Sequence, residues 1–321
     1  MKKQNIGIWI LVIIVVVIAL IVVDFTGGKP GKRAANPYEF NVDEFRHVDE
    51  SLIHYKETRN IQMGNRVAGG IDVLDDRIYL TGENFLMVIS TAGKQLLMLS
   101  LEGKGECIKA TPDRILVGFE TAVSVFDREG KIISTWKIPD ERTVITSIAV
   151  KENRVYIADA GNRRVLRYDF EGNLLGEFEG KRESMAGHGF IVPSPNFDLV
   201  VNSYGELWVV NPGEHSIENY TDEGEIRGYW TKSSMQIEGF TGCCNPAEIS
   251  SMDDGSFITS EKGMVRIKIY DPSGKLVSVV APPDKFVDEG HAPEVVADHA
   301  GVIYALDFDR NIIRIFEKKT V

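Results

Sequence analysis

Apolar and polar residues alternate in short runs along most of this chain, a pattern typical of β-strands. Residues 147–178 (SIAVKENRVYIADAGNRRVLRYDFEGNLLGEF) show it most clearly, with alternating runs at 155–158 and 165–168 and turn-forming residues at 159–162 and 171–173. This segment predicts four short antiparallel strands. A single four-stranded meander cannot bury both of its faces, so it requires neighbouring copies.

Five further segments repeat this pattern. In five of the six units a glycine marks the turn between the third and fourth predicted strands, and successive glycines lie 37 to 52 residues apart: Gly93, Gly130, Gly172, Gly224 and Gly274. A repeat of about 40–50 residues with four strands per unit is typical of a β-propeller blade. The predicted fold class is therefore all-β, a six-bladed β-propeller.

The last unit, residues 294–318, ends before a fourth strand. Residues 51–57 (SLIHYKE) precede the first complete unit and are predicted to supply the missing strand. Pairing the two ends of the chain in this way closes the ring and removes exposed sheet edges, which are aggregation sites.

The N-terminal segment has a different pattern, because residues 6–23 contain only Ile, Val, Leu, Ala, Gly and Trp. A helix of this length spans about 27 Å, close to the roughly 30 Å hydrocarbon core of a bilayer. We predict a transmembrane anchor (1–24), a Gly/Pro/Lys-rich linker (25–37) and a propeller domain (38–321). The alternatives are a buried core segment and a cleaved signal peptide, but residues 22–25 (VVDF) lack the small residues of a cleavage site.

Charge separates the N-terminal segment from the domain. The chain has a net charge of −11, and residues 1–33 carry five basic residues and one acidic residue, so residues 34–321 carry −15. An acidic domain argues against a nucleic-acid partner. Basic residues flank the apolar segment on both sides, but large C-terminal domains cross membranes largely regardless of loop charge. We therefore expect a membrane-anchored protein with its propeller outside the cytoplasm, periplasmic or extracellular.

The sequence of residues 155–172 (VYIADAGNRRVLRYDFEG) closely resembles the NHL repeat, and the other units resemble it more weakly, over about residues 48–318. Four later motifs resemble a bacterial branch of membrane-anchored or exported NHL-type six-bladed propellers: VPSPNFD (192–198), WVVNPGEH (208–215), GFTGCCNP (239–246) and TSEKG (259–263). The resemblance implies a fold but no established reaction, because NHL-type and related propellers include scaffolds, sensor ectodomains, lactonases and lyases.

One face of the propeller is predicted to carry the site. The loops between second and third strands share a face with the connections between blades, and three of these connections are long (180–196, 231–248 and 281–294). The second-to-third-strand loops place polar residues at equivalent positions: Asp159, Asn211, Glu261 and Asp307. These residues would either form a ring of oxygen ligands for a hard cation such as Ca²⁺ in the central channel, or pair within their own repeats. We favour pairing, for example of Asp159 with Arg163 or Arg164.

Two further motifs on this face are candidates for chemistry. In one interpretation Glu261 acts as a general base and Lys262 holds an anionic group. In the other, which we favour, the two residues form a solvated loop pair. The adjacent Cys243 and Cys244 have three interpretations: a vicinal disulfide, a thiolate metal site completed by histidines of the same face (His188, His215 or His291), or two inert thiols. Cys107 is expected to be unpaired.

No P-loop, G-x-S-x-G, H-E-x-x-H or C-x-x-C motif is present in the sequence. The leading hypothesis is a membrane-tethered, non-catalytic propeller without a cofactor, which binds a protein or small ligand on one face, or docks an assembly partner there. The candidate ligand-binding residues are Cys243, Cys244, Asn245, Glu261, Lys262, His215, Asn211, Asp159, Arg163 and Asp307. The alternative is a metal-assisted lyase or hydrolase using the same face. Its reactive groups would be Glu261, His215 or His188, together with a divalent cation in the channel or with the cysteine pair.

Overall fold

The computed structural model describes residues 9, 11–18, 42–181 and 189–320, and the chain divides into two compact units, Met1–Glu44 and Phe45–Val321. In the first unit, residues 9 and 11–18 are helical. Within the described part of the chain, no helix is long and apolar enough to cross a membrane. Most of the predicted anchor, the whole linker and His188 lie outside the described residues.

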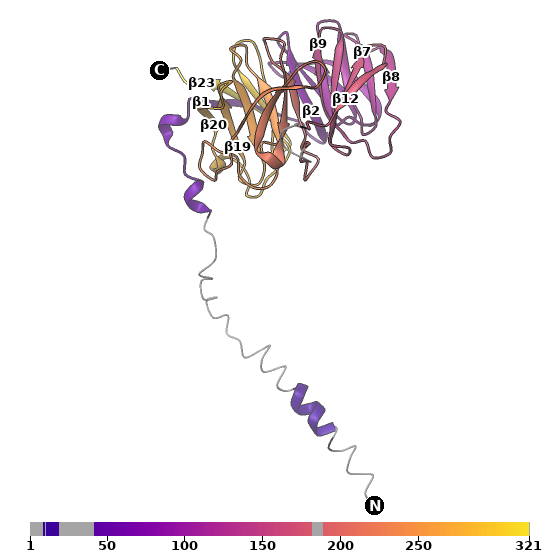
Figure 1. The fold of residues 1–321 in the computed structure, drawn as a ribbon. Helices are drawn as coiled ribbons and strands as arrows, with labels where there is room; N and C mark the ends of the chain where they lie inside the picture. Colours follow the sequence, from indigo (N-terminus) through magenta and orange to yellow (C-terminus); the bar gives the residue numbers. More distant parts are fainter. Residues whose placement is uncertain (1–8, 10, 19–41, 182–188, 321) are drawn as a thin grey trace, which may run out of the picture. The chain divides into compact units, whose positions relative to one another are not determined.

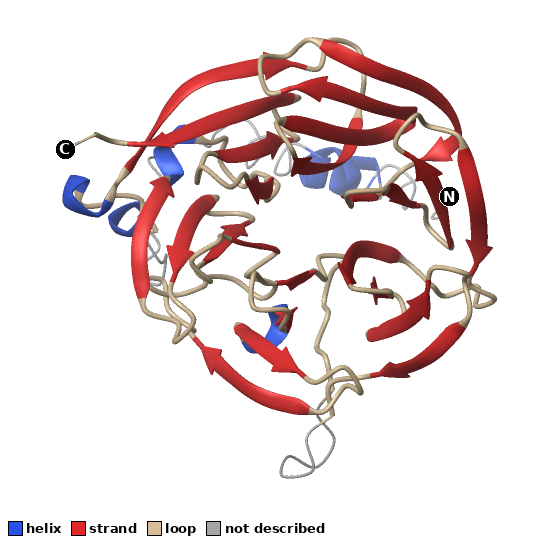
Figure 2. Cartoon of the chain, turned by 90° about the horizontal axis from the view of Figure 1, so that it is seen from above, coloured by secondary structure: helices blue, strands red, loops and turns tan. Residues whose placement is uncertain are grey.

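The second unit is a six-bladed β-propeller, as predicted (Figures 1 and 2). Blades 2 to 5 each contain four antiparallel strands in chain order. From the innermost strand outward, blade 2 contains β5 (Cys107–Ala110), β6 (Arg114–Gly118), β7 (Ala122–Asp127) and β8 (Ile132–Lys137), and blade 3 contains β9 (Ile145–Lys151), β10 (Arg154–Asp159), β11 (Arg164–Asp169) and β12 (Leu174–Phe178). Blade 4 contains β13 (Leu199–Val201), β14 (Leu207–Asn211), β15 (Ser216–Tyr220) and β16 (Ile226–Thr231). Blade 5 contains β17 (Glu248–Ser251), β18 (Phe257–Glu261), β19 (Arg266–Tyr270) and β20 (Leu276–Ala281).

Blade 1 contains three strands, β2 (Ala68–Leu74), β3 (Arg77–Ser90) and β4 (Gln95–Lys104). The first half of β3 pairs with β2 and its second half pairs with β4. Between the halves, Asn84 has a positive φ of 62°, a turn conformation that asparagine tolerates. The long strand β3 therefore takes the place of the second and third strands of the other blades.

Blade 6 combines the two ends of the domain, which confirms the predicted ring closure. It contains β21 (Glu294–Ala297), β22 (Ile303–Asp307), β23 (Ile312–Lys318) and, outermost, the N-terminal strand β1 (Tyr55–Gln62). The closing strand begins later than predicted, because a short 3₁₀ helix, η2 (Glu50–Leu52), precedes it. The other 3₁₀ helices are η1 (Asp43–Phe45), η3 (Pro212–Glu214) and η4 (Pro283–Lys285).

The innermost strands β2, β5, β9, β13, β17 and β21 contact one another in sequence and complete a ring. Apolar side chains of neighbouring blades fill the space between the sheets, as where Leu116 and Val125 of blade 2 pack with Ile157 of blade 3. The long connections after β12, β16 and β20 reach the start of the next innermost strand, so they lie on the same face as the loops between second and third strands. We call this face the loop face.

Candidate functional site

A cavity of about 570 Å³ lies on the loop face where the inner strands begin. Its size falls within the roughly 300–1,000 Å³ typical of small-molecule pockets. All six blades contribute to its lining, through residues such as Gly69, Glu106, Thr146, Asn196, Glu248 and His291. The closed ring therefore gathers side chains that are far apart in the sequence into one concave surface.

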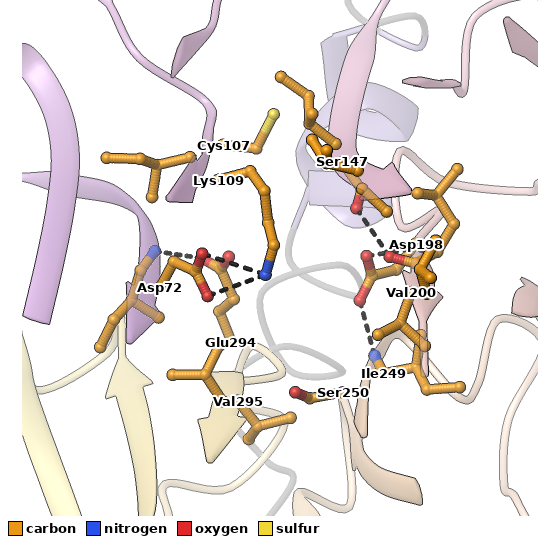
Figure 3. A pocket seen from close by; sticks show the side chains of 18 residues that line it. Asp72, Cys107, Lys109, Ser147, Asp198, Val200, Ile249, Ser250, Glu294 and Val295 are labelled. Carbon is orange, nitrogen blue, oxygen red and sulfur yellow. Dashed lines mark hydrogen bonds and ion pairs between the residues drawn. The ribbon is translucent and has the colours of Figure 1, made fainter. Parts of the chain in front are cut away.

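A narrower cavity of about 70 Å³ lies among the inner strands and shares Glu294 with the loop-face cavity. Figure 3 shows Asp72, Lys109 and Glu294 on one side of this space and Asp198 on the other. Lys109 donates to Asp72 with an Nζ–Oδ1 distance of 3.2 Å. The two cavities together form an acidic channel with a wider mouth on the loop face.

Three of the channel carboxylates also join neighbouring blades. Each accepts a hydrogen bond from a backbone N–H on the inner strand of the next blade: Asp72 from Ala110 (2.8 Å), Asp198 from Ile249 (2.6 Å) and Glu294 from Ile71 (3.0 Å). Hydrogen bonds to charged acceptors are stronger than neutral ones. These acids therefore stabilise the ring while they line the channel.

The environment of the channel raises the pKa of three carboxyl groups. Burial raises the pKa of Glu248 well above its ordinary value, and the nearby carboxylates of Asp198 and Glu294 raise it further. Burial and the Asp198 carboxylate likewise raise the pKa of Glu294 well above normal. Burial raises the pKa of Asp198 less, because backbone N–H groups and Ser147 donate to it. Ionisation of these three carboxyl groups is therefore less favourable in the channel than in water.

Sequence reasoning missed these channel acids. Glu248 and Glu294 are the first residues of their inner strands, and Asp198 directly precedes β13. An acidic residue directly followed by a branched apolar residue at the start of an inner strand was the available signal. The turn glycine that marks each repeat lies between the third and fourth strands, so the repeat pattern does not single out these positions on the inner strands.

The Cys243–Cys244 segment lies on the loop face, close to the cavity. His215, which has a left-handed φ of 52°, bonds through Nε2 to the carbonyl of Gly242 (2.8 Å). On the other side of the segment, Asn245 is buried; its Nδ2 donates to the carbonyl of Thr241 (2.7 Å), and its Oδ1 accepts from the backbone N–H of Lys262 (3.0 Å). The structure thus brings together Cys243, Cys244, Asn245, Lys262 and His215.

Both cysteines are free thiols, with their sulfurs 2.9 Å apart. Burial raises the pKa of Cys244, but hydrogen bonds from Cys243, Ser194 and Lys262 outweigh it and lower that pKa below normal. The hydrogen bond to Cys244 raises the pKa of Cys243. The thiolate therefore forms preferentially on Cys244, next to the ammonium group of Lys262.

The expectation that Glu261 belongs to a solvated loop pair was wrong. Glu261 is fully buried, and its carboxylate contacts Arg266 (2.7 Å) and Lys268 (2.8 Å), which are also fully buried. Burial raises the pKa of Glu261, but these two cations outweigh that effect and lower it. A fully buried, ion-paired carboxylate is not available as a general base, so Glu261 has a positioning role.

The Glu261 cluster holds the connection that leads to the cysteines. Arg266 donates to the carbonyls of Met235, Gln236 and Gly239, and Lys268 donates to those of Ile237 (3.1 Å) and Gly239. Glu261 itself accepts from the backbone N–H of Thr241 (2.9 Å). Buried polar backbone groups need such partners. The side chains of blade 5 therefore fix the path of the connection up to residue 241.

The remaining acidic or amide positions pair within their own blades. Asp159 is fully buried and accepts from Nε of Arg164 (2.9 Å), which confirms the structural interpretation and identifies Arg164 as its partner. Arg163 is exposed and has a left-handed φ of 54°. The other two positions are also buried, with Asn211 donating to Glu218 (3.2 Å) and Asp307 paired with Arg310 (3.0 Å) and Arg314 (3.4 Å). These side chains therefore stabilise blades instead of facing the channel.

Among the described residues, no group of three or more His, Cys, Asp or Glu side chains has the geometry to hold a metal ion. His291 is exposed and pairs with Asp309 (Nδ1–Oδ1 2.6 Å) at the edge of the loop-face cavity. Cys107 is buried and free, as expected.

Neither a model of a known protein family nor a curated protein sequence matches the chain. Among solved structures, the chain is similar to a streptogramin B lyase (12% identity, TM-score 0.59, 83% of this chain and 97% of that one). It is also similar to virginiamycin B lyase from Staphylococcus aureus (18%, 0.58, 83% and 89%) and to the WD40 propeller domain of Doa1 (10%, 0.57, 83% and 98%). At these identities the similarity establishes the propeller fold alone.

Proposed function

We propose that this protein is a non-catalytic binding protein whose ligand occupies the loop-face cavity. The observation that carries the proposal is the cavity itself, because all six blades line it and its volume suits a small molecule or an inserted side chain of a protein partner. Apolar residues such as Phe197 and Phe308 share the lining with Glu106, Glu120 and Glu248. Such a mixture favours an organic ligand held by a few polar contacts.

The acidic lining favours a ligand with a cationic group, such as an amine or guanidinium. The cation would be attracted to the carboxyl groups of Glu248 and Glu294, whose pKa values are raised by burial and by neighbouring carboxylates. A cation favours the ionised form of these groups, so its affinity is expected to increase as the pH rises through their titration. A divalent cation at the same carboxylates is the alternative occupant.

We further propose that the propeller is NHL-type and tethered to the outer side of a membrane. The uncharged residues 6–23 are long enough for a single span, and residues 11–18 within this segment are helical. The net charge changes from positive in residues 1–33 to −15 in the remainder, which suits a soluble domain held at a membrane surface.

The binding proposal is tested with spermidine as a cationic probe, its fully N-acetylated form as a neutral control, and CaCl₂ for the metal alternative. We expect spermidine to raise the melting temperature of the wild type but not of Glu248→Gln. The matched control Glu171→Gln lies in the exposed turn between β11 and β12 and should respond as the wild type does. A stabilisation that persists in Glu248→Gln, or that the acetylated probe also produces, would refute the cation site.

One observation favours a lyase as a second candidate. His291 and Asp309 form a hydrogen-bonded pair at the cavity edge. One similar structure (18% identity, TM-score 0.57) is a catalytically inactive histidine-to-alanine variant of virginiamycin B lyase with quinupristin. If this protein were such a lyase, incubation would deplete quinupristin in a chromatographic assay, and His291→Ala would abolish the loss.

A further inference from the structure

The Cys243–Cys244 pair has properties that ligand binding does not require. The two sulfurs lie 2.9 Å apart, Cys243 is exposed, and Cys244 is 4% exposed beneath it. Three side chains hold the backbone around the pair. His215 bonds to the carbonyl of Gly242, Asn245 accepts from the backbone N–H of Lys262, and Glu261 accepts from that of Thr241. The pair is therefore an accessible dithiol on a fixed support.

A cation lies beside this dithiol. Nζ of Lys262 donates to Oγ of Ser194 (2.7 Å) and to Oδ1 of Asn196 (3.2 Å), and it also interacts with the Cys244 sulfur. A neighbouring ammonium group stabilises a thiolate, which is the reactive form of cysteine. The structure thus supplies the proximity, access and charge that thiol–disulfide exchange requires.

We propose that Cys243 and Cys244 form a redox site that exchanges with a low-molecular-weight disulfide. The reaction starts with Cys243 as the thiol and Cys244 as the thiolate. Cys243 transfers its proton to the Cys244 thiolate and attacks the disulfide RSSR, which forms a Cys243–SR mixed disulfide and releases RS⁻. That RS⁻ takes the proton of Cys244, whose thiolate then attacks the Cys243 sulfur and releases the second RS⁻. The protein dithiol is oxidised to a vicinal disulfide, and RSSR is reduced to RSH and RS⁻.

Oxidation also affects the loop-face cavity, and this consequence rests on the proposed binding function. Disulfide formation removes the thiolate that neighbours Lys262. Asn196, one of the two residues that accept hydrogen bonds from Lys262, lines the cavity together with Glu248. Lys262 then becomes an uncompensated cation near the acidic mouth. We therefore expect the oxidised protein to bind a cationic probe less tightly than the reduced protein.

The test incubates the purified full chain with glutathione buffers of increasing GSSG content, then uses denaturing alkylation and intact-mass measurement. We expect two alkylatable thiols to disappear together, while the third, Cys107, remains. Cys107→Ala should titrate as the wild type does, and Cys243→Ser should not form the internal bond. Three thiols that persist in GSSG alone, or a stable glutathione adduct on the wild type, would overturn the proposal.

The role of Lys262 has its own readout. Lys262→Gln should slow the exchange about tenfold at pH 7, because it removes the positive charge that lowers the pKa of Cys244. A nearby opposite charge changes a pKa by roughly 1–3 units, and the partial exposure of this site favours the lower end of that range. The control Lys275→Gln changes an exposed lysine in the turn between β19 and β20 and should leave the rate unchanged. Equal rates for wild type and Lys262→Gln would refute this role. Because neither assay uses a cavity ligand, their failure would leave the binding proposal to its spermidine test.

Discussion

Replacing Glu261 by glutamine should be among the most damaging single changes in the domain. The carboxylate accepts from Arg266 through Nε (2.9 Å) and through Nη2 (2.7 Å), and from Lys268 (2.8 Å), and all three side chains are fully buried. Removing one partner of a buried ion pair typically costs about 3–5 kcal/mol, since it leaves uncompensated charge. Total stability is about 5–15 kcal/mol for a typical domain, so a large fraction would be lost.

Urea unfolding at pH 7, followed by tryptophan fluorescence, measures this loss, because Trp208 and Trp230 pack in the adjoining core. The exposed Glu171→Gln variant should stay within about 0.5 kcal/mol of the wild type. Alkylation of Cys243 should also become faster in Glu261→Gln, because the preceding connection loses its anchor at Thr241. A stability loss below about 1 kcal/mol would refute the conclusion that the cluster fixes this connection.

Two further predictions concern charge and ring closure. Burial lowers the pKa of Lys268 to about 7. This folded-state pKa lies below the unfolded value of about 10.4, so between these two pH values the unfolded chain binds more protons than the folded one. The unfolding free energy of the wild type, measured relative to Lys268→Met, should therefore fall as the pH is lowered towards 7. A difference between the two proteins that does not change with pH would contradict this. A chain starting at residue 45 should fold without aggregating. A chain starting at residue 63 lacks β1, exposes β23 and should aggregate on size-exclusion chromatography.

The fold could be predicted because its signals are local and repeated. Each blade carries its own alternation, five of the six carry a turn glycine, and these glycines at 93, 130, 172, 224 and 274 all have positive φ. Ring closure followed from a missing strand in one terminal unit and a spare strand before the other. The start of that strand was misplaced by four residues, because residues 50–52 form a 3₁₀ turn in a sequence that also suits a strand.

The partners of charged side chains were harder to predict, because they depend on packing between distant segments. Glu261 occupies the same repeat position as Asp159, but Lys268 and the connection after β16 enclose it completely. Local sequence around residue 261 does not indicate that enclosure. The channel acids face the same difficulty, since the nearness of Asp198 to Glu294 results from closure of the whole ring.

The double role of the channel acids determines which substitution can separate function from stability. Asp198 and Glu294 each accept a backbone N–H from the next blade, so neutralising either one weakens a junction of the ring as well as the cavity. Glu248 interacts instead with the side chains of Asn196 and Asp198. Its replacement by glutamine should therefore preserve the melting temperature while it removes affinity for a cation. If Glu248→Gln unfolded as readily as Glu294→Gln, the channel acids would be structural elements first, and the acidic lining would lose its value as evidence for a cationic ligand.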